Sequence, residues 1–154
     1  MTRTQFTTLV AGVTARIAGR PLDDALETHL ERAFPAGGPV YRSMVEACRD
    51  GIAEGWMCSQ GGPGRRFGRV LEAAEATHDL SVDVVELEDV VGPHHRHPNG
   101  EICLVMPGGA ATFDGRGAGW VVYGPGSAHR PTVRNGKAVV LYMLPKGAIE
   151  FTNQ

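Results

Sequence analysis

The sequence has little of three things: long apolar runs, net charge and cysteine. No apolar run approaches the roughly 20 residues that a membrane-spanning helix requires, and residues 1–5 lack the apolar core of a signal peptide. The formal net charge is only −2, which gives no electrostatic basis for binding nucleic acid or an anionic membrane. The three cysteines are an odd number without the spacing of a disulfide framework, which suits a reducing cytoplasm.

The composition that remains is typical of a globular protein. The chain has 154 residues, of which 42% are hydrophobic and 21% charged, enough for one domain with a sizeable core. The first third has the apolar periodicity of amphipathic helices, interrupted at Gly19 and at the Pro- and Gly-rich residues 35–39. The pattern predicts three helices over residues 6–17, 22–34 and 40–54.

From Leu80 onward the period changes to short aliphatic and β-branched runs. Turns rich in glycine and proline separate these runs. Asp114-Gly115 and Asn135-Gly136 are two-residue hairpin signals. Regular short strands with such turns predict a mainly β fold, an antiparallel barrel or sandwich.

These patterns divide the chain into two parts. We expect an N-terminal helical segment over residues 1–56 and a β-barrel over residues 57–154. The helices either pack on the barrel or build an oligomer interface. Between the two parts, residues 56–58 suggest a short strand and residues 61–68 a flexible, basic loop.

Several metal-ligating side chains are concentrated in one short stretch. In a strand, alternate residues share a face, so His95 and His97 point the same way. Residues 98–100, Pro-Asn-Gly, turn the chain, and Glu101 then opens the next strand on the same side. One hairpin cannot surround a metal, so a fourth ligand must come from a distant strand. His129 qualifies because it follows a tight turn after an apolar run.

The ligand types narrow the choice of metal. Three imidazoles and one carboxylate suit Fe, Mn, Zn, Ni or Co better than Mg or Ca. Four protein ligands leave a position open on a five- or six-coordinate ion, as Lewis-acid chemistry requires. We therefore expect one divalent transition-metal ion; the alternative is a surface histidine cluster on a metal-free protein. His94 should point away from the metal, because it has the opposite parity to His95.

The same residues carry a resemblance to a known superfamily. The pattern Gly-x-x-His-x-His-x-x-x-Glu-x-x-x-x-x-x-Gly, from Gly92 to Gly108, resembles the first cupin motif, and Gly126-x-x-His129 resembles the core of the second. The departures lie in the turns and not in the ligands: a short interval after Gly92, Gly124 in place of proline and Val133 in place of asparagine. The resemblance implies a single cupin barrel.

A narrower resemblance covers nearly the whole chain. Residues 95–105, 119–133 and 141–151, together with the helical N-terminal third, are similar to the 4-hydroxylaminobenzoate lyase family. That family converts 4-hydroxylaminobenzoate to 3,4-dihydroxybenzoate (protocatechuate) and ammonia in nitroaromatic degradation. The resemblance therefore implies a small aromatic carboxylate as substrate.

Such chemistry needs a proton-transfer group beside the metal, a cation for the carboxylate and an apolar slot for the ring. The candidates for catalysis are Glu101, Tyr123 and Arg130. The candidates for substrate binding are Arg65, Arg66, Trp56 and Cys103. The alternative for each is an ordinary structural role: a solvated loop for the first two arginines, an ion pair for Arg130, and core packing for Trp56, Tyr123 and Cys103.

Two other functions fit the same ligands. One is a cupin dioxygenase or isomerase acting on a small aromatic, which dependence on oxygen would distinguish. The other is a non-enzymatic sensor of small molecules, although the sequence has no pair of DNA-binding helices with a basic face. Exposed edge strands and an N-terminal helical layer favour a homodimer.

Overall fold

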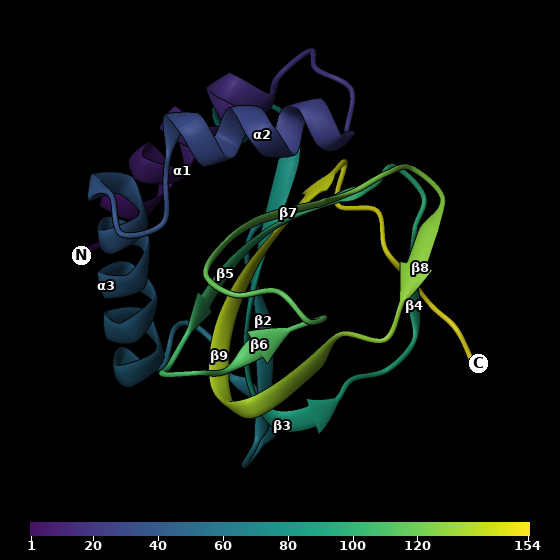
Figure 1. Cartoon of the computed structure of the whole chain (residues 1–154). Coiled ribbons are helices and arrows are strands. Elements are labelled where there is room, and N and C mark those ends of the chain that lie inside the picture. The colour runs from purple at the N-terminus through teal and green to yellow at the C-terminus, as the bar shows by residue number, and fades with distance from the viewer.

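Three helices precede every strand in the chain. The computed structural model describes residues 1–154, and Figure 1 shows the helices gathered beside and above a curved β-structure. The helices are α1 (Arg3–Ile17), α2 (Asp24–Ala33) and α3 (Pro39–Glu54), and a 3-10 helix spans Glu75–Thr77. None of the helices is long and apolar enough to cross a membrane.

Local signals set the helix ends. Thr2 accepts a hydrogen bond from the backbone N–H of Gln5, whose side chain accepts in return from the Thr2 N–H, which forms a capping box at the start of α1. Asp23 caps α2 by accepting from the Leu26 N–H at 3.0 Å. Gly55 ends α3 with a φ of 86°, a left-handed conformation that glycine adopts without steric cost.

Ten strands form two antiparallel sheets. The larger sheet has the order β1-β2-β3-β9-β5-β7, with β6 also paired to β9, and the smaller has the order β10-β4-β8. The strands are β1 (Gln60–Gly62), β2 (Arg65–Leu71), β3 (Leu80–Val91), β4 (His95–His97), β5 (Glu101–Pro107), β6 (Thr112–Phe113), β7 (Gly119–Tyr123), β8 (Ser127–His129), β9 (Thr132–Pro145) and β10 (Glu150–Phe151).

The central strands of the larger sheet are buried on both faces. On β5, Ile102 and Leu104 join the hydrophobic cluster that contains the helices. Cys103 and Val105, of the opposite parity, join a second cluster inside the barrel. Because side chains alternate along a strand, Glu101 is on the interior face with Cys103. The mainly β fold, with antiparallel sheets and an N-terminal helical segment, is thus confirmed, whereas the division at residue 56 stays a prediction.

Helix α2 covers the β7 edge of the larger sheet. The Glu31 carboxylate accepts a hydrogen bond from the Trp120 N–H at 2.7 Å, and Glu27 accepts from the Val122 N–H at 2.9 Å. Both donors belong to β7, the last strand in the order. These carboxylates satisfy N–H groups that would otherwise be open to pairing with another chain.

Three local predictions were wrong. Residues 56–58 form a bend and no strand. Residues 61–68 are no loop, because they form most of the β1–β2 hairpin, whose register pairs Gly62 with Arg65. Asn135-Gly136 makes no hairpin: it lies inside the continuous strand β9, beside a register shift opposite β3. Asp114-Gly115 does form a tight turn, with positive φ at both residues and paired hydrogen bonds between Phe113 and Arg116.

Candidate metal centre

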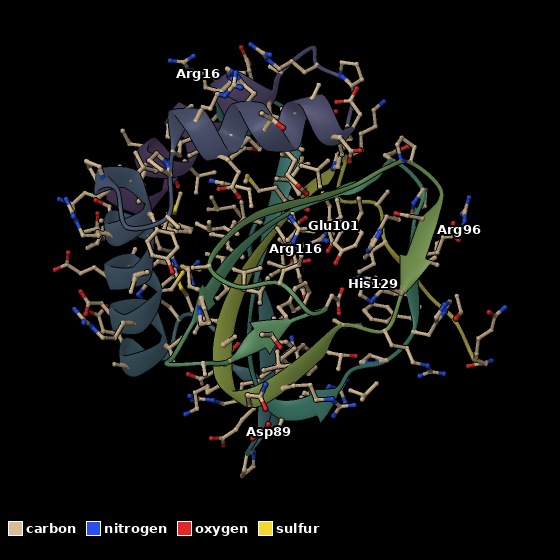
Figure 2. All side chains as sticks on the ribbon, in the orientation of Figure 1. Arg16, Asp89, Arg96, Glu101, Arg116 and His129 are labelled. Carbon is tan, nitrogen blue, oxygen red and sulfur yellow. The ribbon has the colours of Figure 1, made fainter.

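Three histidines and one glutamate come together between the two sheets. His95 and His97 lie on β4, His129 on β8, and Glu101 begins β5 of the larger sheet. One possible ligand atom from each of the four lies within 4.8 Å of all the others. Figure 2 shows Glu101 and His129 inside the barrel and Arg96 pointing outward from the opposite side of β4. The structure thus assembles the four residues that the sequence suggested as ligands.

Strand register and one glycine create this arrangement. His95 stands directly opposite His129 in the β4–β8 pair, so the distant histidine reaches the hairpin through the smaller sheet. Gly100 turns the chain between β4 and β5 with a φ of 86°. A Cβ atom there would lie 2.7 Å from the Tyr123 carbonyl oxygen and 2.6 Å from Leu22. Only glycine fits this position, which sets where Glu101 begins its strand.

Each histidine is held through its Nδ1 atom. His95 Nδ1 lies 3.3 Å from the Pro93 carbonyl oxygen, and His97 Nδ1 lies 3.0 Å from the Ser127 hydroxyl. His129 Nδ1 lies 2.6 Å from a carboxylate oxygen of Asp114. An Nδ1 atom that donates to an oxygen leaves Nε2 as the free lone pair. Contacts of this kind orient metal-ligating histidines in proteins.

The Nε2 atoms gather on the Glu101 carboxylate. Nε2 of His97, His95 and His129 lies 2.7, 3.5 and 3.9 Å from the nearest Glu101 oxygen. Despite these short distances, His97 Nε2 and Glu101 Oε2 are buried without a hydrogen-bond partner of acceptable geometry. Buried polar atoms are rarely left unpartnered. His129 Nε2 also lies 3.1 Å from His95 Nε2. Three imidazole nitrogens and one carboxylate that converge on one point fit a shared cation, so the donor set fits a transition metal.

The charge of Glu101 is favoured by its neighbours. Burial raises the pKa of this carboxyl, but contacts with His95 and His97 outweigh burial and lower the pKa to about 2. Cys103 donates a hydrogen bond from Sγ to the other carboxylate oxygen at 2.8 Å. Burial, and then the Glu101 charge, raise the pKa of the Cys103 thiol well above its usual value. Cys103 therefore remains a neutral donor that fixes the Glu101 side chain.

Asp114 is the residue that the sequence did not identify. Its Oδ2 atom accepts from the Tyr123 hydroxyl at 2.5 Å and lies 2.6 Å from His129 Nδ1, while Oδ1 accepts from the Thr132 N–H at 2.9 Å. Burial raises the pKa of Asp114, but the bonds from His129 and Tyr123 leave it below the usual value. Its only sequence signal was Asp-Gly, which predicts a turn and carries no information about a histidine partner.

A cavity of about 290 Å³ opens beside His95. Its lining includes apolar and aromatic side chains from β2, β3, β9 and the C-terminal strand β10. The residues most relevant to a ligand are Arg65, Phe67, Arg69, His95, Tyr142 and Phe151. The volume is close to the lower end of the range for small-molecule sites.

Of the four residues predicted to bind the substrate, only Arg65 lines the cavity. Arg65 lines the cavity, stands over the Phe67 ring at 5.3 Å and forms no ion pair. Arg66, its neighbour on β2, points to the other face and pairs with Glu86. Trp56 lies in the helical layer, where its ring packs edge-on against Phe6 at 5.9 Å. The structure therefore brings Arg65 to the cavity and leaves Arg66 and Trp56 away from it.

The remaining candidates are placed as follows. The Tyr123 ring is tilted against the His129 ring, with their centroids 4.6 Å apart, and its hydroxyl donates to Asp114. Arg130 is exposed, and its side chain makes no hydrogen bond or ion pair. His94 faces away from the other three histidines, as its parity predicted, and its ring contacts the Thr152 hydroxyl.

Comparisons with known proteins identify the family. The family model described as PnbB, 4-hydroxylaminobenzoate lyase, matches residues 8–151. A 4-hydroxylaminobenzoate lyase of Nocardioides sp. (strain LMS-CY) is 32% identical over 88% of this chain and 86% of that protein. The enzyme of that name from Pseudomonas putida is 28% identical over 91% of this chain and 90% of that protein.

One solved structure adds a more distant likeness. A protein of unknown function with a cupin-like fold from Ralstonia eutropha JMP134 is 18% identical, with a TM-score of 0.46 over 64% of this chain and 65% of that chain. The family model and the curated relatives both extend over most of the sequence. The chain belongs to the 4-hydroxylaminobenzoate lyase family.

Proposed function

We propose that this protein is a metal-dependent lyase that converts 4-hydroxylaminobenzoate and water into 3,4-dihydroxybenzoate and ammonia. One observation carries the proposal: the group of His95, His97, Glu101 and His129 adjoins a cavity that suits a single aromatic ring. Family membership supplies the substrate. The atoms balance with one water, so no external oxidant or reductant is needed.

The four residues would hold one ion of Fe, Mn, Zn, Ni or Co. Their three imidazoles and one carboxylate suit these ions, and four ligands leave room for an oxygen from outside the protein. When bound, such an ion supplies Lewis acidity toward an oxygen in its open coordination position. Glu101 would act as a ligand and as the negative charge that balances the ion, with Cys103 fixing its second oxygen.

Arg65 is the residue best placed to bind the substrate carboxylate. A second arginine, Arg69, lines the same cavity, but Asp83 at 2.8 Å and Glu72 at 3.6 Å already neutralise it. Arg65 has no such partner, and its guanidinium can bind a carboxylate through two parallel hydrogen bonds. The ring of the substrate would then lie against Phe67.

The residues around His129 would position it and would not exchange protons with the substrate. Because the Tyr123 hydroxyl already donates to Asp114, we assign Tyr123 a positioning role through that carboxylate, in place of the direct catalytic role expected from the sequence. Arg130 stays a candidate without a contact that assigns its role.

We also propose that the protein is a homodimer and that it works in the reducing cytoplasm. Three cysteines that are all free and buried are in line with a reducing compartment. Sedimentation velocity tests the dimer.

The test is turnover of the authentic substrate without oxygen. Metal-loaded protein is incubated anaerobically with 4-hydroxylaminobenzoate, and ammonia and 3,4-dihydroxybenzoate are measured. We expect the two products in equal amounts. His95→Ala should lose both metal and activity, whereas His94→Ala, a histidine of the same segment that faces away, should retain both.

Two results would contradict the proposal. Metal-replete protein that releases neither product would exclude this substrate. Turnover of an aromatic only when oxygen is present would favour a dioxygenase that uses the same ligands.

A further inference from the structure

The side chain of Tyr142, on β9, is buried inside the barrel, yet its hydroxyl has no partner. The residue is only 4% exposed, and no protein group lies within hydrogen-bonding geometry of its hydroxyl oxygen. The other unpartnered buried oxygen or nitrogen atoms inside the barrel are His97 Nε2 and Glu101 Oε2, both in the proposed metal centre. Buried polar atoms in folded proteins usually have a partner, and exceptions are often functional.

Strand register places Tyr142 beside the metal centre. It stands opposite Cys103 on β5, and Cys103 donates to Glu101. On its other side it stands opposite Asp83 on β3, which in turn pairs with Arg69 on β2. Tyr142 and His95 both line the cavity. The residue is thus part of the cavity wall and stands opposite the cysteine that holds the Glu101 carboxylate.

The same strand register determines how a benzoate would be oriented in the cavity. Along β2, Arg65 comes first, Phe67 is two residues further, and Arg69, in the row of Tyr142, is two residues beyond that. At about 3.3 Å per residue, the Arg65 and Tyr142 rows are about 13 Å apart along the strand. A benzoate whose carboxylate binds the long Arg65 side chain would place its ring beside Phe67 and its para substituent toward Tyr142.

We propose that the Tyr142 hydroxyl donates a hydrogen bond to the para substituent of a bound benzoate, which for the proposed substrate is the oxygen of the N-hydroxyl group. The identity of that substrate rests on the proposed function. Tyr142 would therefore select benzoates with a polar para group and hold the N–O bond next to the metal centre. A phenol is protonated at neutral pH and is a competent donor.

The test uses unreactive ligands, so it does not depend on turnover. Binding of 4-hydroxybenzoate and of 4-methylbenzoate to the metal-loaded protein is measured by calorimetry, for the wild type and for Tyr142→Phe. The two ligands have similar size, but only the first has a para oxygen that can accept a hydrogen bond. We expect Tyr142→Phe to weaken 4-hydroxybenzoate binding about tenfold, the effect of one buried hydrogen bond, and to change 4-methylbenzoate binding less than twofold.

A matched control separates this role from a structural one. Tyr41→Phe removes one hydroxyl from α3, on the helical side of the sheet, and should alter neither affinity. Because the Tyr142 hydroxyl has no partner to lose, Tyr142→Phe should fold and keep its metal content. Equal affinities of Tyr142→Phe and wild type for 4-hydroxybenzoate, or equal weakening for both ligands, would overturn the proposal. If the selectivity holds but 4-hydroxylaminobenzoate is not turned over, only the proposed reaction fails.

Discussion

The substitution Asp114→Asn tests whether the carboxylate behind His129 sets the metal affinity. Asp114 accepts on two sides, from Thr132 through one oxygen and from His129 and Tyr123 through the other. Asparagine has one acceptor oxygen and so can serve only one side. The backbone should tolerate the change, because Asp114 has a φ of 49° and asparagine is common in this region.

The expected loss of metal affinity follows from the tautomer of His129. If the amide NH₂ faces Nδ1, that nitrogen becomes an acceptor and the ring proton moves to Nε2, the atom needed for the metal. If the amide oxygen faces Nδ1 instead, Thr132 loses its acceptor and His129 faces a neutral group, which makes the ring a weaker ligand. Changes of this kind typically cost 10–100-fold in metal affinity, equivalent to about 1.4–2.8 kcal/mol.

The measurement is a metal titration in competition with a chromophoric chelator, with elemental analysis of the purified proteins. Asp89→Asn is the matched control: Asp89 also has a positive φ, of 43°, and accepts from the Gly136 N–H at 3.2 Å, but contacts no histidine. Figure 2 shows it well away from Glu101 and His129. An Asp114→Asn affinity within twofold of the wild type would refute the argument that this carboxylate fixes a metal-ligating histidine.

Three further outcomes are expected. Arg65→Gln should raise the KM for 4-hydroxylaminobenzoate about 10–100-fold, the effect of a lost charge-assisted contact. Arg66→Gln should leave the KM unchanged, because Arg66 pairs with Glu86. Equal effects of the two substitutions in steady-state assays would contradict the role of Arg65 in binding the carboxylate. Glu31→Ala should lower the free energy of unfolding in urea by about 1–3 kcal/mol, because the Trp120 N–H loses its acceptor, while the exposed Glu46→Ala should change it little. None of the three cysteines should react with a thiol reagent in the native protein, even at pH 9. All three are buried, and burial raises the pKa of Cys48 and of Cys58 to about 12. Urea should expose all three thiols, and a reactive thiol in the native protein would contradict the prediction.

The group of four residues at the candidate metal centre was predictable from the sequence, because its geometry is mostly local. Alternation along a strand put His95 and His97 on one face, and the Pro-Asn-Gly turn returned the chain so that Glu101 joined them. His129 required one longer step, from a tight turn to a strand that pairs with β4. Each step depends on residues close in sequence or on a single strand pair.

Glycine-rich signals were less reliable because strand pairing overrides them. Residues 61–68 contain the turn chemistry of a loop, but Phe67 pairs with Val85 on β3, so the segment becomes an edge hairpin. Asn135 and Gly136 do have positive φ values, as a turn would require. The residues before and after them both pair with the same strand, β3, so the chain continues and the signal produces a bulge instead of a hairpin.

The contact between Asp114 and His129 could not be predicted from residues adjacent in the sequence. Asp89 and Asp114 share a residue type, a positive φ and an acceptor role toward a backbone N–H. What distinguishes them is the pairing of β6 with the start of β9, which directs the Asp114 carboxylate to the Thr132 N–H and, through its other oxygen, to His129. An aspartate can close a turn with one oxygen while its second oxygen orients a ligand. Sequence predicts the first role from two adjacent residues, whereas the second depends on which strand arrives beside the turn.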